Sequence, residues 1–149
     1  MDFSGPLTQE HIAEIQKHSK YVQSNIVQQY SELSENYESI YLKVGWTDPL
    51  KIAELADEIT PEESKSTSLV LDLGCGTGLV GKYLDERKFK IIDGIDATEN
   101  MVNIAKEKKV YRDFDIFFLG KPASFPVKYH GKYDIVTASG LLAEGHVDC

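Results

Sequence analysis

The sequence of 149 residues contains only two cysteines, Cys75 and Cys149, and this scarcity argues against a disulfide framework. The four histidines are scattered without the spacing of metal ligands, so we predict no metal site. No apolar run approaches the ~20 residues of a membrane span, and nothing near the start resembles a signal peptide. These absences together predict a cytoplasmic protein in a reducing compartment, with no membrane partner.

The sequence also lacks a basic stripe. It has 16 Lys and Arg residues against 24 Asp and Glu residues, which gives a formal net charge of −8. Residues 106–109 mix both signs, as a solvated helix face does. Binding to nucleic acid requires positive charges that neutralise several phosphates, so the composition argues against a nucleic-acid partner. Small molecules and proteins stay open as partners.

One stretch organises the rest of the chain, which is long enough to bury a single core. The apolar run 69–73 ends in glycines at alternate positions, Gly74, Gly76 and Gly78, and a helical pattern follows. This order predicts a buried strand, a tight turn and a helix N-terminus. Glycine lets the backbone turn sharply and touch a ligand, and the unpaired amides of the helix favour an anionic group. We interpret the stretch as a nucleotide-cofactor turn.

The details of the turn distinguish among nucleotide-binding loops. A phosphate-cradling loop needs Lys and then Ser or Thr after its last glycine, but Leu79 and Val80 follow Gly78. Residues 76–81, with Gly81 last, satisfy the dinucleotide fingerprint. In that fingerprint the first glycine should come directly off the strand, whereas here the strand already ends at Gly74. An NAD-linked enzyme is therefore the weaker alternative.

Two carboxylates narrow the choice of cofactor. Residues 91–96 form a second predicted strand that ends in Asp96, which can accept hydrogen bonds from both ribose hydroxyls of an adenosine. Asp72, near the end of the first strand, would repel a pyrophosphate but attract a cationic ligand. S-adenosylmethionine combines an adenosine with a carboxylate and two positive centres. We therefore predict S-adenosylmethionine as the cofactor.

These motifs carry a resemblance to a known family. Residues 72–78, 94–101 and 133–136 are similar to the first, second and fourth-strand motifs of class I S-adenosylmethionine-dependent methyltransferases. Within that superfamily the chain most resembles the methyltransferase-like proteins named after the Williams–Beuren syndrome critical region, through residues 75–80, 110–111 and 139–147. The superfamily resemblance covers roughly the second half of the chain. It implies an α/β, Rossmann-like three-layer sandwich and a set of cofactor-binding residues: Asp72, Gly74, Cys75, Gly76, Thr77, Gly78, Asp96, Ala97, Met101 and Tyr37.

Helical patterns precede the first strand. We predict an N-terminal helical cap over 1–60 and the cofactor-binding domain over 61–149, in a single structural unit. Thr8 is a candidate N-cap for the first helix. A second helical pattern carries Val22, Ile26, Tyr30, Leu33 and Tyr37. Periodicity alone makes this stripe a packing surface, while the resemblance implies a lid over the cofactor cleft in which Tyr37 contacts the ligand.

A further helix is predicted to start at Asp48 as the cap, with Pro49 as its first residue. Its predicted apolar face consists of Ile52, Leu55, Ala56 and Ile59. After the second strand, Thr98 is predicted to cap another helix, and strands are expected at 113–119 and 133–138. The alternation of strands and helices predicts a parallel sheet with right-handed crossovers.

Two segments hold candidate site residues beyond the third and fourth strands. Family members grip the adenine just past the third strand, where this sequence departs from their pattern with residues 120–123, so a backbone carbonyl or Ser124 would have to substitute. His146 follows the fourth strand, where open α/β sheets place ligand-facing loops, and is a candidate general base. The competing interpretation of His146 is an ordinary polar loop residue. The catalytic residues stay unassigned.

The complete fold of the family has seven strands, and only four are found in this sequence. We therefore expect a fragment, a truncated product, or a chain completed by a partner, with the C-terminal strands missing. The fourth strand would form a sheet edge with apolar Ile135 and Val136, which favours self-association. The predicted function is methyl transfer to an unidentified small-molecule or protein acceptor. The alternative is a catalytically inactive fragment that binds the cofactor or another protein.

Overall fold

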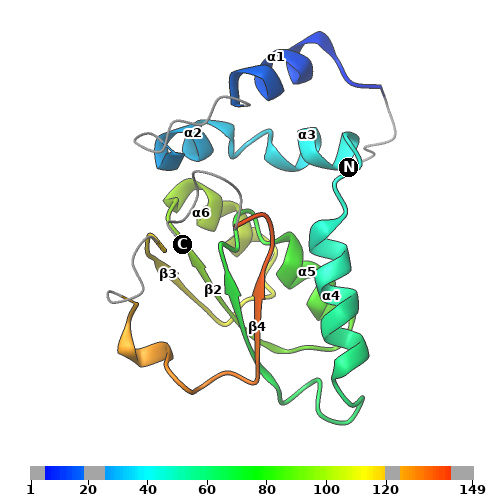
Figure 1. Ribbon diagram of the computed structural model, residues 1–149, viewed down its shortest axis with the longest axis vertical. Coiled ribbons are helices and arrows are strands. Elements are labelled where there is room, and N and C mark those ends of the chain that lie inside the picture. The colour runs from blue at the N-terminus through cyan, green and yellow to red at the C-terminus, as the bar shows by residue number, and fades with distance from the viewer. Residues whose placement is uncertain (1–5, 19–25, 120–124, 142–149) are drawn as a thin grey trace.

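A parallel four-stranded sheet forms the centre of the computed structural model, which describes residues 6–18, 26–119 and 125–141 (Figure 1). The strands are β1 (Leu69–Leu73), β2 (Ile91–Asp96), β3 (Asp113–Ile116) and β4 (Ile135–Ala138), in the order β3-β2-β1-β4. Every pairing is parallel, which confirms the predicted sheet. β3 is shorter than predicted because its neighbour β2 ends at Asp96, and residues 117–119 lie beyond that end.

Side chains alternate between the two faces of the sheet, so that Val70 and Ile92 face one side while Leu71 and Ile95 face the other. On the first side lie helices α4 (Asp48–Ile59) and α5 (Leu79–Glu86). They join a buried cluster of Ala53, Ala56, Val70, Val80, Leu84, Phe89 and Ile92. Helix α6 (Glu99–Glu107) contacts β2 and β3. This strand–helix arrangement confirms the Rossmann-like α/β fold.

The second face of the sheet is covered differently. Leu71 and Ile95 pack there with Tyr129, which lies in a short 3₁₀ helix, η3 (Val127–Tyr129). The aromatic side chains of Phe117, Phe125 and Tyr133 extend this cluster. In the part of the chain that the structure describes, one helical layer of the expected sandwich is therefore present, and aromatic side chains cover the other face.

Helix α4 differs from its prediction at both its start and its exposed side. Its N-cap is Thr47 rather than Asp48, and no side chain makes a capping hydrogen bond there. The prediction that Leu55 and Ile59 face the core was wrong, since they are 58% and 74% exposed. The buried face consists of Pro49, Ala53 and Ala56 instead. Small alanine side chains allow α4 to pack closely against α5, and this contact fixes which face is buried.

Three further helices lie beyond the carboxyl ends of the strands (Figure 1): α1 (Gln9–His18), α2 (Ile26–Leu33) and α3 (Tyr37–Lys43). The predicted cap of α1 is confirmed, because the hydroxyl oxygen of Thr8 accepts a hydrogen bond from the His11 amide at 3.2 Å. None of the helices among the described residues is long and apolar enough to span a bilayer.

The helical pattern predicted to continue to Tyr37 breaks after Leu33 in the structure. The Ser34 hydroxyl donates to the Ser31 carbonyl at 2.8 Å, and the Asn36 amide donates to the Leu33 carbonyl at 2.9 Å. These short-range bonds replace the helical ladder, so Tyr37 starts a separate helix. Val22 lies outside the described residues. The division of the chain at residue 60 stays a prediction, although α4 belongs to the layer that packs on the sheet.

Candidate functional site

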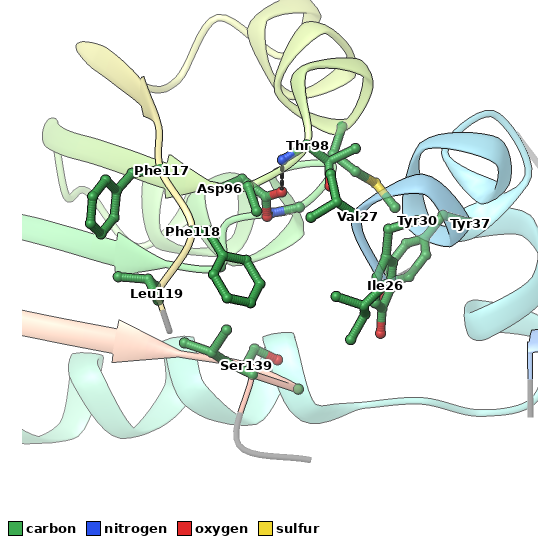
Figure 2. Close-up of a pocket in the computed structure, with 16 residues that line it drawn as sticks. Ile26, Val27, Tyr30, Tyr37, Asp96, Thr98, Phe117, Phe118, Leu119 and Ser139 are labelled. Carbon is green, nitrogen blue, oxygen red and sulfur yellow. Dashed lines mark hydrogen bonds between the residues drawn. The ribbon is translucent and has the colours of Figure 1, made fainter. Parts of the chain in front are cut away.

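A cavity opens at the carboxyl ends of the strands, beneath α2 and α3 (Figure 2). Its lining comes from the turn after β1, the end of β2, the segment after β3, the end of β4 and the N-terminal helices. The cavity gathers six of the ten predicted cofactor residues: Tyr37, Gly74, Gly76, Asp96, Ala97 and Met101. Open α/β sheets bind their ligands at this edge, so the cavity is the candidate site.

The glycine turn forms the wall of the cavity next to β1. Gly74 follows the last residue of β1 directly, with φ +66°, and Gly76 has φ +53°. Residues other than glycine adopt this left-handed region at a cost. Among the described residues, a Cβ added to Gly76 would meet only the Gly74 carbonyl oxygen, at 3.9 Å. The backbone at Gly76 is therefore open to a ligand, and the strand breaks at Gly74, as the sequence predicted.

Asp96 ends β2, lines the cavity next to the glycine turn and is half-buried. One carboxylate oxygen accepts the Gly76 amide at 2.8 Å, and the other accepts the Thr98 amide at 2.8 Å. Burial raises the pKa of Asp96, and the hydrogen bonds from Gly76 and Thr98 oppose that rise. A carboxylate offers about four lone-pair positions, so about two stay available to ligand hydroxyls.

Asp72 does not line the cavity. It is fully buried behind the glycine turn, where it accepts the Tyr111 hydroxyl at 2.7 Å and the Thr137 hydroxyl at 2.9 Å. Burial raises the pKa of Asp72 to about 7, against the lowering effect of these two hydrogen bonds. Asp72 was predicted to attract a cationic ligand, but its side chain is not among those that line the cavity.

The other three predicted residues outside the cavity lie inside the turn and shape it. Cys75 is a buried free thiol, and its sulfur lies 2.9 Å from where a Cβ on Gly94 would be. Burial raises the pKa of that thiol well above its usual range. Thr77 is buried, and Gly78, with φ +87°, is the N-cap of α5. We infer that these residues support the ligand-facing backbone.

Gly81 lies against a side chain that is distant in the sequence. Helix propensity alone predicts that an alanine there is tolerated or stabilising, because Gly81 lies inside α5. In the structure an added Cβ would lie 2.3 Å from the Tyr111 ring and 2.5 Å from its hydroxyl oxygen. That hydroxyl accepts the Gly81 amide at 3.0 Å while it donates to Asp72. Gly81 therefore leaves space for a partly buried tyrosine that is distant in sequence.

Several lining residues were missed by sequence reasoning. They are Ile26, Val27, Tyr30, Thr98, Phe117, Phe118, Leu119, Ser139, Gly140 and Leu141. The hydroxyl of Ser139 is buried and has no hydrogen-bond partner among the residues that the structure describes, so it is available to a ligand. Ser139 could have been predicted from its position directly after β4, because open α/β sheets bind ligands at the carboxyl ends of their strands.

Tyr37 is held in place by neighbouring rings. Its ring centroid lies 4.5 Å from that of Tyr41 and 5.8 Å from that of Trp46. His146 and the adenine-contact segment 120–124 lie outside the described residues.

A family model described as a methyltransferase domain matches residues 70–148, just over half of the chain. The chain belongs to this methyltransferase domain family. The match begins in β1 and includes every predicted cofactor residue except Tyr37.

Individual methyltransferases are similar to parts of the chain. Human methyltransferase-like protein 27 is 33% identical over 84 residues, which cover 56% of this chain and 33% of the relative. Ubiquinone biosynthesis O-methyltransferase of Coxiella burnetii is 26% identical over 95 residues, which cover 64% of this chain and 38% of the relative. The chain thus spans little more than a third of the length of these curated relatives. The narrower resemblance to the Williams–Beuren proteins stays a prediction.

Solved methyltransferases share the fold of this methyltransferase domain. Magnesium protoporphyrin IX methyltransferase from Synechocystis PCC 6803 aligns with a TM-score of 0.54 at 23% identity, covering 81% of this chain and 63% of that one. The amino pentose methyltransferase CalS10 from Micromonospora echinaspora aligns with a TM-score of 0.52 at 24% identity, covering 70% and 42%. Both confirm the class I, Rossmann-like arrangement.

Proposed function

We propose that this chain binds S-adenosylmethionine in the cavity and takes part in transfer of its methyl group to an acceptor. The observation that carries the proposal is the meeting of Asp96 with the glycine turn. A half-buried carboxylate with acceptor positions to spare lies beside backbone that only glycine leaves open. Membership of the methyltransferase domain family supports the same conclusion.

The residues present fit this cofactor. Asp96 would accept hydrogen bonds from the ribose hydroxyls, and the open backbone at Gly76 would face the rest of the molecule. Tyr30 and Tyr37 line the cavity and offer aromatic faces to a positive sulfonium. The bound cofactor supplies an electrophilic methyl group. The chain orients it and excludes water. The Ser139 hydroxyl, which is unpaired within residues 6–18, 26–119 and 125–141, can help to orient it.

The acceptor that we propose is a small molecule or a protein, because a net charge of −8 disfavours nucleic acid. The name of the Coxiella relative specifies transfer to oxygen in ubiquinone biosynthesis, and oxygen is therefore one acceptor atom to try. We also propose a cytoplasmic location, because Cys75 is a buried free thiol within the cofactor turn. His146 stays the candidate general base.

Calorimetry with S-adenosylmethionine and with NAD tests the cofactor assignment. We expect S-adenosylmethionine to bind, and Asp96→Ala to lose about 1.5–3 kcal/mol for each charge-assisted hydrogen bond removed. Asp96→Asn should lose less, since one acceptor oxygen stays. Asp85→Ala is the matched control, because Asp85 lies on the exposed side of α5 and pairs with Lys90. Affinity of Asp96→Ala within about twofold of the wild type would refute the assignment.

Two other outcomes favour the alternatives. Binding of NAD in preference to S-adenosylmethionine would support the alternative in which residues 76–81 form a dinucleotide-binding fingerprint. Saturable binding of S-adenosylmethionine without turnover on a panel of acceptors would support the inactive, cofactor-binding fragment.

A further inference from the structure

Lys108 lies at the C-terminal end of α6 and joins two segments that are far apart in the sequence. Its ammonium group donates to a Glu38 carboxylate oxygen at 2.5 Å and to the Thr77 carbonyl oxygen at 2.8 Å. The Lys108 and Glu38 side chains are 17% and 25% exposed, so water screens their attraction less than that of a surface pair. One cation therefore bridges α3 and the glycine turn.

Both partners of Lys108 are next to residues that line the cavity. Glu38 follows Tyr37 at the start of α3, and Thr77 follows Gly76 in the turn. A ligand in the cavity would lie between Tyr37 and Gly76. The contacts of Lys108 therefore connect two parts of the cavity lining that have to move apart before a bound cofactor can leave.

The lid helices, α2 and α3, bury Ile26, Leu33 and Ile40, and they also make polar contacts with other parts of the described structure. Neither buried cluster around the sheet includes one of their described residues. On α2, Ser31 accepts a hydrogen bond from the Asn100 side chain at 2.7 Å. Near α3, the Trp46 ring approaches Gly140, at 3.3 Å from where a Cβ would be. Segments that lie outside the main buried clusters of a domain are the ones in which local opening is expected to start.

We propose that Lys108 is a positioning residue that holds the lid helices against the cofactor turn and so sets how long the cofactor stays bound. The proposal rests on the proposed function, because it concerns the retention of S-adenosylmethionine in the same cavity. Without the ammonium group, α3 loses its ionic contact and the Thr77 carbonyl loses its donor. Both losses favour the open lid, from which the cofactor escapes faster.

The dissociation rate of S-adenosylmethionine is the first measurement, followed through the fluorescence of Trp46, the one tryptophan of the sequence. Lys108→Met keeps the length of the side chain and removes its charge, and we expect the rate to rise about 5- to 20-fold. Glu38→Gln should raise it less, because the Thr77 contact is kept. Lys106→Met is the matched control, since Lys106 contacts Asn103 of its own helix, and its rate should equal that of the wild type.

A charge exchange separates the two contacts of Lys108. Lys108→Glu alone sets two carboxylates against each other, whereas adding Glu38→Lys restores an ion pair but supplies no donor to Thr77. We expect the double variant to recover part of the residence time lost in the single variants. Raising the salt concentration from about 0.05 M to about 1 M should speed dissociation from the wild type but not from Lys108→Met.

Hydrogen exchange of the α3 amides without cofactor distinguishes this proposal from the proposed function. Lys108→Met should increase exchange in α3 and in the glycine turn while β1 and β2 stay protected. This result is expected even if S-adenosylmethionine proves not to be the ligand. Exchange and dissociation rates of Lys108→Met within about twofold of the wild type, or a double variant no better than Lys108→Glu, would overturn the proposal.

Discussion

Substitution of Gly81 by alanine tests the packing behind the cofactor turn. Helix propensity alone predicts that the change stabilises the protein by about 1 kcal/mol. The structure predicts the opposite, because the new Cβ would lie 2.3 Å from the Tyr111 ring. Either the ring or helix α5 has to move. The Tyr111 ring packs against the partly buried Phe114 and reaches the fully buried Asp72. Helix α5 is held by Val80 and Leu84, which belong to the buried cluster.

The magnitude follows from the contacts that are lost. Overpacking of a filled site costs about 1–3 kcal/mol. Displacement of the ring also breaks its hydrogen bond to the fully buried Asp72 and leaves the Gly81 amide without a partner, at about 1–3 kcal/mol for each unsatisfied group. After subtraction of the gain of about 1 kcal/mol in helix propensity, we expect a net loss of about 2–8 kcal/mol, a large part of the stability of a typical domain.

Urea unfolding followed by circular dichroism measures this loss. A double-mutant cycle with Tyr111→Ala provides the control, because removal of the ring should make Gly81→Ala neutral or stabilising. An equally large loss in both backgrounds would assign the effect to the helix itself. A single Gly81→Ala variant as stable as the wild type would refute the packing described for Tyr111.

Three further predictions concern the turn, the buried carboxyl group and the sheet edge. Gly76→Val should weaken S-adenosylmethionine binding more than ~10-fold, because it forces a branched side chain into φ +53° beside the cavity. Gly131→Val is the control for backbone strain, since Gly131 has φ +64° and an added Cβ there would meet no described atom within 4 Å. Because burial raises the pKa of Asp72 to about 7, the folded state binds an extra proton at this group. The contribution of Asp72 to stability should therefore be highest below about pH 4 and fall by up to ~1.4 kcal/mol per pH unit as the pH rises towards 7. Asp72→Asn should remove this pH-dependent contribution to stability. The measurement compares the pH profile of the variant with that of the wild type, because Asp72 interacts with four other groups: Tyr111, Thr137, Cys75 and Asp96. Residues 1–149 should self-associate through the β4 edge, where Val136 is 58% exposed. In size-exclusion chromatography, Val136→Lys should shift the elution towards the monomer. A monomeric wild type would contradict this prediction.

The strand–turn–helix unit could be predicted because its signals are local. An apolar run, three glycines with positive φ and the carboxylate of Asp96 all appear within two short stretches of sequence. Their placement follows from the rule that parallel sheets bind ligands at strand carboxyl ends. The same rule located the cavity, and six predicted residues line it.

The remaining features depend on contacts between distant residues. Tyr111 fills the space beside Gly81 from 30 positions away, and no local pattern indicates that pairing. Leu55 continues the helical period of α4, yet alanines face the core because α5 approaches closely. The break after Leu33 arises from side-chain bonds to the backbone near Ser34, which compete with a helix that the apolar spacing alone would continue.

The position of β1 in the middle of the sheet has a consequence for the order of folding. Its pairing with β2 closes a short segment of chain, in which Leu69 meets Ile91. Its pairing with β4 requires the Leu69 amide to find the Asp134 carboxylate across 65 positions, at 2.8 Å in the folded state. Closing a longer loop costs more entropy and takes more time. We therefore expect β1, α5 and β2 to assemble first during synthesis, so that the glycine turn and Asp96 take shape before Ser139 arrives to complete the cavity.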